Sequence, residues 1–307
     1  MNIRFDGKVV IVTGAGAGLG RQYALDLSSR GAKVVVNDLG TTMDGQGGSQ
    51  SAADNTVKAI IDAGGQAIPS YDSVATIEGG ESIVANALTQ WGRVDGVIAN
   101  AGILRDRSFV KLDYADMDAV LDVHLRGGFF VLAPAFRAMK EAGEGGGLVV
   151  TTSASGLFGN FGQSAYGAAK SGLVGLIRTL AIEGKKYGIR ANALAPIAAT
   201  RLTTNTMEET GDEGKEDELS PAKVSPLATY LVHPECPATG EIYMAGGGWF
   251  TRCAMVAGSG WVAGDTDYSV EDVAEHFGVV RDLSLPTEPT NAMEVGAIMR
   301  AHMREGC

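Results

Sequence analysis

The stretch Lys8–Leu25 reads KVVIVTGAGAGLGRQYAL and decides how this chain begins to fold. An apolar run of strand length leads into a glycine-rich turn, and the residues after the turn have helical periodicity. Glycines in this context are typical of a phosphate-binding turn, because Gly14, Gly18 and Gly20 let the backbone bend tightly and approach a pyrophosphate at a helix N-terminus. The stretch therefore predicts the first strand, turn and helix of a dinucleotide-binding α/β fold.

Segments of strand length and segments of helical period alternate through the chain that follows. The expected strands are AKVVVNDLG (32–40), QAIPSYDS (66–73), VDGVIANAG (94–102), GLVVTTS (147–153) and IRANALAP (189–196). The expected helices cover residues 19–29, 52–63, 77–91, 114–141 and 164–185. Such alternation predicts parallel strands joined by crossover helices, and continuous Val/Ile runs suit strands that are covered on both faces. We expect an α/β fold with a doubly wound parallel sheet of the Rossmann type.

The length of 307 residues suits one large α/β domain. We expect an NAD-binding domain over residues 1–248. A C-terminal extension over residues 249–307 is expected to pack on the same domain and to contain helices at 270–277 and 292–303. Residues 207–219, MEETGDEGKEDEL, carry seven carboxylates against one lysine and are interpreted as a solvated, mobile loop.

Composition and charge argue against several classes of protein. With 45% hydrophobic and 20% charged residues the chain is ordinary for a globular enzyme and unlike a disordered one. The net charge of −11 argues against a nucleic-acid partner, because affinity for phosphates needs clustered Lys and Arg. Met1–Asp6 lacks a signal-peptide pattern and the apolar runs are shorter than the roughly 20 residues of a spanning helix, so a cytoplasmic protein without a membrane span is expected. Cys236, Cys253 and Cys307 show no C-x-x-C spacing, and no metal site is expected.

Asp38 ends the second expected strand, eighteen residues after Gly20. A carboxylate near this spacing holds the ribose 2′-hydroxyl of a dinucleotide, and it would repel a 2′-phosphate. Neither Ala17 nor Leu39 supplies a compensating cation, so the expected cofactor is NAD rather than NADP. The alternative for Asp38 is a turn-forming aspartate. Because doubly wound sheets bind ligands at strand carboxyl ends, further cofactor contacts are expected from the residues after the third and fourth strands, Asp72, Ser73 and Asn100.

The stretch SASGLFGNFGQSAYGAAK, Ser153–Lys170, carries the candidate chemistry. Tyr166 and Lys170 are four residues apart in a helical segment and share one face. A neighbouring ammonium and the positive nicotinamide ring of NAD⁺ would favour phenolate and lower the tyrosine pKa from about 10, making the phenol a usable acid and base. Ser153 ends the strand beside this helix, where its hydroxyl can hold the reacting oxygen while hydride moves to or from carbon. Taken alone, a tyrosine on a helix usually packs, a lysine is usually solvated and a serine usually forms a turn. Because the three occur together downstream of a nucleotide-binding turn, they predict a catalytic set.

The chain resembles the short-chain dehydrogenase/reductase family in its T-G-x-x-x-G-x-G, N-A-G and S…Y-x-x-x-K motifs, at Thr13–Gly20, Asn100–Gly102 and Ser153–Lys170. The resemblance covers residues 5–248. Longer strings such as NAGILRDRSF and VHLRGGF are similar to one branch of the family. That branch is the (3R)-hydroxyacyl-CoA dehydrogenase unit of the peroxisomal multifunctional β-oxidation enzyme, with its stand-alone actinobacterial relatives.

The resemblance implies an NAD-dependent oxidoreductase with Ser153, Tyr166 and Lys170 as its catalytic residues. It also implies that the loop 197–200 contacts the cofactor. The expected cofactor-binding residues are Gly14, Gly18, Leu19, Gly20, Asp38, Asp72, Ser73, Asn100, Tyr166, Lys170, Ile197 and Thr200. Members of the family associate through the helices that correspond to residues 114–141 and 164–185, so a homodimer or homotetramer is expected.

One residue departs from the pattern of many family members. His124 in VHLRGG stands where they place an asparagine that anchors a water-mediated proton relay. The branch with hydroxyacyl-CoA activity resembles this chain in having histidine there. Two hypotheses stay open for His124: support of the relay, or a packed imidazole bonded to backbone.

The substrate is a small molecule whose identity the residues leave open. The branch implies oxidation of (3R)-3-hydroxyacyl-CoA to 3-oxoacyl-CoA, and CoA phosphates need basic partners. Arg105, Arg107 and Arg201 are candidates, with the alternative that each pairs with a nearby carboxylate. A hydroxysteroid or other bulky secondary alcohol is the second possibility, and an NAD-binding scaffold or sensor without turnover is the third.

Overall fold

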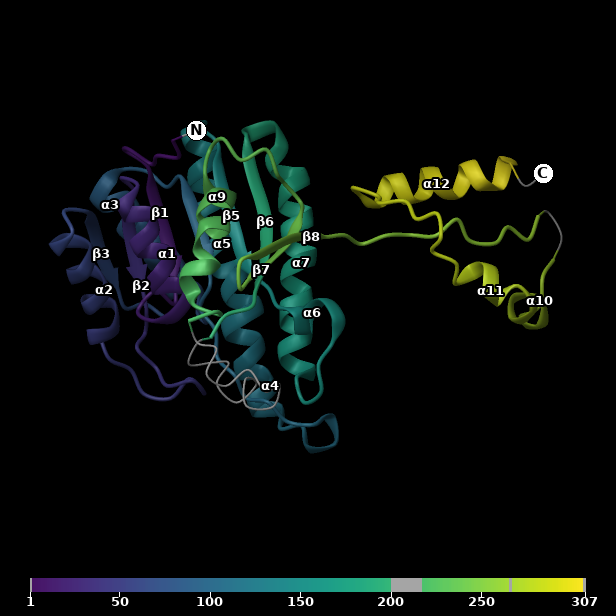
Figure 1. The fold of residues 1–307 in the computed structure, drawn as a ribbon, viewed down its shortest axis with the longest axis horizontal. Helices are drawn as coiled ribbons and strands as arrows, with labels where there is room; N and C mark the ends of the chain where they lie inside the picture. The colour runs from purple at the N-terminus through teal and green to yellow at the C-terminus, as the bar shows by residue number, and fades with distance from the viewer. Residues whose placement is uncertain (1, 200–216, 265–266, 306–307) are drawn as a thin grey trace. The chain divides into compact units, whose positions relative to one another are not determined.

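The computed structural model describes residues 2–199, 217–264 and 267–305 of the chain (Figure 1). The chain divides into two compact units, Met1–Arg252 and Cys253–Cys307. In the described part of the chain, the first unit contains the sheet and the helices that cover it, and the second contains three helices. The two units are described separately below.

The first unit is organised around one eight-stranded sheet with the order β3-β2-β1-β4-β5-β6-β7-β8. Every neighbouring pair from β3 to β7 is parallel. The strands are β1 Val9–Thr13, β2 Lys33–Asn37, β3 Gln66–Ser70, β4 Gly96–Ala99, β5 Gly146–Thr151, β6 Ile189–Pro196, β7 Ile242–Gly246 and β8 Trp249–Cys253. The order of the first six is that of a doubly wound sheet, so the predicted fold class is confirmed.

Helices cover both faces of this sheet, as the apolar strands require. Helix α1 packs against α2 and α9 on one face, while α3 packs against α5, and α4 against α7, on the other (Figure 1). The helices of this unit are α1 Gly18–Ser29, α2 Ser51–Asp62, α3 Ile77–Trp91, α4 Tyr114–Leu121, α5 Gly127–Ala142, α6 Ala154–Phe158, α7 Ser164–Gly184 and α9 Ser225–Val232. Single 3-10 turns cover Phe109–Lys111, Lys185–Tyr187 and Pro221–Lys223.

The helix predicted over 114–141 is present but changes its winding in the middle. Between α4 and α5 the residues Asp122–Arg126 form a π-helical turn. Such turns occur mostly as local bulges inside helices and are frequent at functional sites. Within the described residues this run, Tyr114–Ala142, is also long and apolar enough to cross a membrane, a test that core helices of soluble proteins pass equally.

Among the strands and α-helices described in the first unit, α6, α9, β7 and β8 were not predicted from the sequence. Helix α6 has only 5 residues and α9 has 8, so neither offers a sustained helical period. Strands β7 and β8 are joined by Gly247 and Gly248, both with positive φ, which suits a two-residue hairpin turn. Strand β8 is mostly exposed and lacks the alternation that identifies a half-buried strand.

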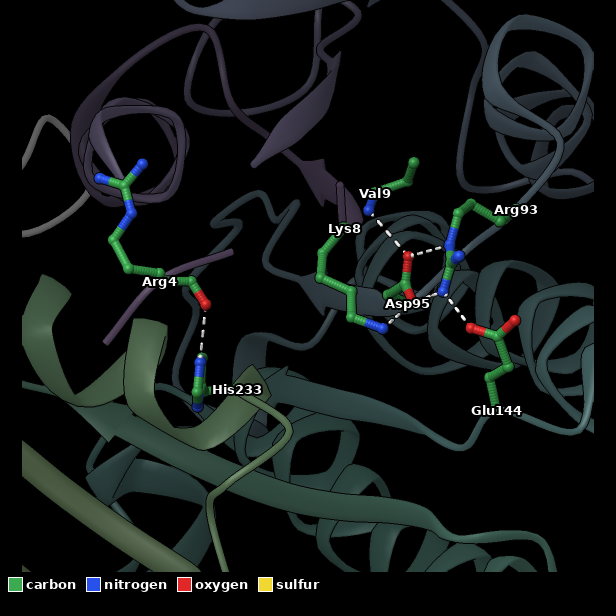
Figure 2. A network of polar contacts seen from close by, with 7 residues as sticks. All are labelled: Arg4, Lys8, Val9, Arg93, Asp95, Glu144 and His233. Carbon is green, nitrogen blue, oxygen red and sulfur yellow. Dashed lines mark hydrogen bonds and ion pairs between the residues drawn. The ribbon is translucent and has the colours of Figure 1, made fainter. Parts of the chain in front are cut away.

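A network of charged side chains lies just before β4, at the amino ends of the parallel strands (Figure 2). The Asp95 carboxylate accepts hydrogen bonds from the Val9 backbone N–H at 2.9 Å, from Lys8 Nζ at 3.1 Å and from two nitrogens of Arg93. Burial alone would raise the pKa of Asp95, but these bonds outweigh it and hold the pKa below its usual value. The network ties the start of β1 to the start of β4 in the middle of the sheet.

The second unit contains α10 Val270–Glu275, α11 Phe277–Val280 and α12 Ala292–Glu305, so the two helices predicted there are confirmed. Helix α10 begins with a capping box in which Ser269 and Asp272 each accept the other's backbone N–H. The Trp261 ring stacks on His276 with centroids 4.3 Å apart. None of the side chains described between 253 and 304 is buried, and the packing of this extension on the first unit stays a prediction.

Candidate active site

A cavity of about 490 Å³ opens at the carboxyl ends of the parallel strands. Its wall contains residues from the ends of β1, β2, β4, β5 and β6 and from the loops that follow them. Ten of the predicted site residues line it: Gly14, Gly18, Leu19, Asp38, Asp72, Ser73, Asn100, Ser153, Tyr166 and Lys170. The topology therefore brings together residues that lie more than 150 positions apart in the sequence.

The glycine-rich turn is closely packed, and three of its glycines, Gly14, Gly16 and Gly20, have no room for a side chain. A Cβ on Gly14, which has φ +64°, would lie 2.8 Å from the Ala101 Cα. A Cβ on Gly20 would lie 2.1 Å from the Gly14 carbonyl oxygen, so Gly20 supports the turn and does not line the cavity. Helix α1 begins after Ala17 without any side-chain cap or acidic residue in its first turn, which leaves its N-terminal N–H groups available to an anion.

Asp38 is held beside this turn by two backbone donors. Its Oδ2 accepts the Gly16 N–H at 2.7 Å and its Oδ1 accepts the Gly40 N–H at 2.6 Å. Among the described residues of the cavity wall, the lysine and arginine side chains are those of Lys170 and Arg105. A carboxylate without an adjacent cation at the end of β2 is the arrangement that the sequence analysis expected.

Asn100 and Thr13 join the ends of three central strands. The Asn100 amide nitrogen donates to the Thr13 carbonyl at 3.1 Å, and its amide oxygen accepts the Thr151 hydroxyl at 3.2 Å. The Thr13 hydroxyl oxygen accepts the N–H groups of Asn100 and Ala101 at 3.0 and 3.1 Å. Thr13 was named as the first residue of the T-G-x-x-x-G-x-G motif but not as a site residue, although a polar residue that ends a run of valine and isoleucine was a signal for such a role.

Asp72 and Ser73 lie at the end of β3, where Asn37 supports them. The Asn37 side chain donates to the Asp72 carbonyl at 2.9 Å, and the Asp72 carboxylate accepts the Ser70 hydroxyl at 3.0 Å. Asn37 is buried and lines the cavity, but the sequence analysis did not name it. These bonds give the Asp72–Ser73 wall a defined position.

The three predicted catalytic residues come from β5 and the helices after it. Ser153 follows β5 and caps α6, where its hydroxyl accepts the Ser155 N–H at 3.2 Å. Tyr166 and Lys170 lie on α7, and the Lys170 Nζ is 5.5 Å from the centre of the Tyr166 ring. The Thr152 hydroxyl donates to the Lys170 carbonyl at 2.8 Å and so fixes α7 against the end of β5.

Burial sets the protonation of the Tyr166–Lys170 pair. Lys170 is 3% exposed and donates to the Thr151 carbonyl at 2.5 Å, and burial lowers its pKa to about 7. Burial raises the pKa of Tyr166, and a hydrogen bond with Ser153 opposes this only in part. In the protein alone, the expected lowering of the tyrosine pKa by Lys170 is therefore absent, because the same burial that favours neutral phenol also disfavours the ammonium.

His124 lies on the π-helical turn and packs edge to face on Tyr166, with ring centroids 5.1 Å apart. Its Nε2 is 2.8 Å from the Ile103 carbonyl oxygen, while its buried Nδ1 has no hydrogen-bond partner among the described residues. Burial, followed by the nearby Lys170 charge, lowers the pKa of His124 well below its usual value, so the imidazole is neutral. A Cβ on Gly102 would lie 2.3 Å from His124 Cε1, so the glycine of N-A-G makes room for this ring. The packed imidazole bonded to backbone is what the geometry shows, and a relay role stays a prediction.

Two of the arginines considered for CoA phosphates, Arg105 in the cavity wall and Arg107, have carboxylate partners. The Arg105 guanidinium is 3.3 Å from one Asp116 oxygen, and Arg107 is 2.7 Å from the other. For Arg105 and Arg107, the alternative in which the arginine pairs with a nearby carboxylate is thus the observed one. Ile197 is exposed and does not line the cavity, although Pro196 and Ala198 do. Thr200, Arg201 and residues 207–216 lie outside the described residues.

Comparison with known proteins places these features in a family. The family model for short chain dehydrogenases matches residues 8–213. The short-chain type dehydrogenase/reductase Rv0148 of Mycobacterium tuberculosis is 50% identical over 277 residues, which cover 90% of this chain and 95% of that protein. The hydroxyacyl-CoA dehydrogenase ChsB1 of the same organism is 33% identical, over 96% of this chain and 94% of its own length.

Similarity extends to a longer enzyme. The peroxisomal multifunctional enzyme type 2 of Drosophila melanogaster is 43% identical over 302 residues, or 97% of this chain. Its full-length structure matches with a TM-score of 0.81 and 36% identity, covering 99% of this chain and 50% of the other. This chain thus spans about half the length of that relative. From the matched residues, the parallel sheet and the Ser153, Tyr166 and Lys170 cluster in its cavity, we conclude that the chain belongs to the short-chain dehydrogenase/reductase family of nicotinamide-dependent oxidoreductases.

Proposed function

We propose that this chain is an NAD-dependent dehydrogenase that interconverts (3R)-3-hydroxyacyl-CoA and 3-oxoacyl-CoA. The observation that carries the proposal is the meeting of Ser153, Tyr166 and Lys170 in one cavity whose wall also contains the glycine turn and Asp38. A hydride acceptor and an acid–base group can both reach a substrate carbon and oxygen only in such an arrangement.

The residues present fit a dinucleotide. The tight packing around Gly14 and Gly20 brings backbone N–H groups of the turn to the cavity, as a pyrophosphate requires. Asp38 faces the same cavity with a carboxylate that suits a ribose diol and repels a 2′-phosphate. Asp72, Ser73 and Asn100 would contact the cofactor farther along the wall, and the 197–200 loop would add contacts from the end of β6.

The chain's own residues would handle the proton of the alcohol. Bound NAD⁺ supplies the hydride acceptor and a positive ring that favours ionised Tyr166. Ser153 would donate its hydroxyl hydrogen bond to the substrate oxygen, while Tyr166 takes the proton from that oxygen as the carbon loses hydride. Lys170, held by the Thr151 carbonyl, would stabilise the resulting charge on the tyrosine oxygen.

Two observations support an acyl-CoA substrate. The similar proteins include one whose name states hydroxyacyl-CoA dehydrogenase activity, and the multifunctional enzyme is similar over almost the whole of this chain. Arg105 and Arg107 do not contribute free positive charge to a CoA site, because both are paired with Asp116. The phosphates of the substrate would then be held elsewhere, with the acyl end in the cavity.

We also propose that the chain forms a homo-oligomer through α5 and α7. Phe129 on α5 is 48% exposed and Ile182 on α7 is 54% exposed, which would suit burial against a second copy. Light scattering on the purified chain should give a mass at least twice that of the 307-residue monomer. A mass of one chain at micromolar concentration would contradict this proposal.

The direct test follows NADH absorbance with (3R)- and (3S)-hydroxyacyl-CoA esters and with hydroxysteroids, each with NAD and NADP. Turnover of the (3R) esters with NAD is expected. Exclusive turnover of steroids would favour the bulky-alcohol alternative, and binding of NAD without turnover of any alcohol would favour a scaffold.

Tyr166→Phe should lower kcat by about 100- to 10,000-fold, the usual contribution of a positioned acid or base. Tyr114→Phe, at an exposed tyrosine, serves as the matched control.

A further inference from the structure

The segment Gly40–Ser49, between β2 and α2, forms a loop whose ends meet. The Ser49 N–H donates to the Leu39 carbonyl at 3.1 Å. Gly40 has φ +68°, and a Cβ there would lie 1.9 Å from the Ser49 carbonyl oxygen, so the neck has no room for a side chain. Compact loops with closed necks are frequently functional. We call residues 40–49 the β2 loop.

The tip of the β2 loop has its own turn. The Thr42 N–H donates to the Gln46 carbonyl at 3.0 Å, and the Thr42 hydroxyl oxygen accepts the Gln46 N–H at 3.0 Å. These bonds hold residues 42–46 together but do not attach them to the sheet. Most of the loop is exposed, so hydrophobic burial contributes little to its position.

Two hydrogen bonds attach this tip to the loop that follows β4. The Leu104 N–H donates to the Met43 carbonyl at 3.0 Å, and the Arg105 Nε donates to the Asp44 carbonyl at 2.8 Å. Ile103 packs beside Gly45, where a Cβ would be 3.2 Å from its methyl group. The other end of the guanidinium binds Asp116 on α4 at 3.3 Å. Arg105 therefore links the β2 loop, the loop after β4 and helix α4.

The linked segments border the same cavity. Thr41, Thr42, Met43 and Gly45 of the β2 loop line it together with Ile103 and Arg105 of the loop after β4. At the neck of the β2 loop, the Asp38 carboxylate binds the Gly40 N–H and the Gly16 N–H of the glycine turn. A change in the β2 loop would therefore be transmitted directly to the carboxylate assigned to the ribose.

We propose that Arg105 is a positioning residue for the dinucleotide site, which holds the β2 loop against the loop after β4 and so slows release of the cofactor. The inference rests on the proposed use of this cavity for NAD. Without Arg105 the β2 loop keeps one hydrogen bond to the loop after β4, from the Leu104 N–H to the Met43 carbonyl. The cofactor itself then has to order the β2 loop when it binds. Weaker binding follows, because part of the binding free energy is spent on ordering the loop.

The side-chain chemistry favours arginine at this position. A guanidinium presents donors in a fixed plane and can bind a carbonyl and a carboxylate at the same time, whereas a lysine ammonium is a compact point charge. Arg105→Lys should therefore restore the charge but only part of the attachment. Arg107→Ala is a matched control, because Arg107 shares Asp116 yet makes no hydrogen bond to the β2 loop among those described.

The test compares wild type, Arg105→Ala, Arg105→Lys and Arg107→Ala by NADH fluorescence titration, stopped-flow release and amide hydrogen exchange. Arg105→Ala should raise the Kd for NADH and its release rate by about tenfold, the effect of losing one charge-assisted hydrogen bond. Exchange at residues 42–49 and at Leu104 should become faster without cofactor. The KM for NAD should rise while kcat stays level or increases, and Arg105→Lys should fall between the two.

Three results have defined meanings. Equal NADH affinity and equal loop exchange in Arg105→Ala and wild type would overturn the inference while leaving the proposed function intact. Equal weakening in Arg105→Ala and Arg107→Ala would also overturn it, because the effect would then come from Asp116 and not from the β2 loop. Absence of NADH binding in wild type would instead defeat the proposed function. A melting temperature measured for every variant separates loop effects from general unfolding.

Discussion

Replacing Lys170 by methionine should change how the stability of the protein depends on pH. Lys170 is buried, and its pKa falls from the ordinary 10.5 to about 7 in the folded protein. Between these two values the unfolded chain holds the proton and the folded chain does not, so unfolding takes up a proton. The free energy of unfolding of the wild type therefore rises with pH in this window, by about 1.4 kcal/mol per pH unit from this group.

The magnitude follows from the size of the shift. At pH 7, where the folded lysine is half protonated, its burial costs the folded state about 4 kcal/mol, and at pH 9 about 2 kcal/mol. Methionine has similar length and no charge, so Lys170→Met should be the more stable protein at pH 7. Its advantage should shrink by about 2 kcal/mol between pH 7 and pH 9.

Guanidinium unfolding at pH 7, 8 and 9 measures this difference for the two proteins. Tyrosine and cysteine side chains are common to both, so their titration cancels in the comparison. Lys185→Met, which removes an exposed lysine just beyond the same helix, should leave the pH slope of the wild type unchanged. Parallel pH dependences for wild type and Lys170→Met would refute the assignment of a depressed pKa to Lys170.

Three further perturbations test the site and its support. Asp38→Ala should reduce the preference for NAD, measured as kcat/KM with NAD divided by kcat/KM with NADP, by about tenfold or more, because the carboxylate that repels a 2′-phosphate is gone. An unchanged preference in the absorbance assay would contradict the cofactor assignment. Asp95→Asn should lower the free energy of unfolding by about 2–3 kcal/mol near neutral pH, as measured by chemical unfolding. This loss should disappear as pH falls through the depressed folded pKa of Asp95. A loss that persists at low pH would show that the charge is not responsible. Gly102→Ala should lower the melting temperature of the wild type but not that of a His124→Gly protein, because the added methyl group contacts the imidazole. An equal decrease in melting temperature in both backgrounds would place the clash elsewhere.

Much of the fold follows from local patterns. Valine-rich runs and helical periods at regular spacing leave parallel strands with helical crossovers as the arrangement that buries both faces of the sheet. Helix α3 is a clear case: its predicted and observed limits agree because Thr76 caps its start and Gly92, in the left-handed region, ends it. Strand β8 was missed since an exposed edge strand carries no such pattern.

Part of the candidate site could likewise be predicted from local sequence, and part could not. The glycine turn, Asp38 and the Ser153, Tyr166 and Lys170 set were predictable because their spacing along the chain reflects one turn of helix or one strand end. The partners of Arg105 and Arg107 were not, since Asp116 lies on another element and nothing in the local sequence indicates which carboxylate a guanidinium meets.

By itself, then, the sequence determined the alternation of strands and helices from β1 to β6 and which side chains are available at the strand ends, because these depend on neighbours along the chain. Only the tertiary structure decided the charges of those side chains and the room around them. Lys170 has a pKa of about 7 because segments distant in sequence exclude water from it, and His124 fits because Gly102, in the loop after β4, leaves space for its ring. Burial and close packing are properties of three-dimensional neighbourhoods, and a linear pattern does not specify them.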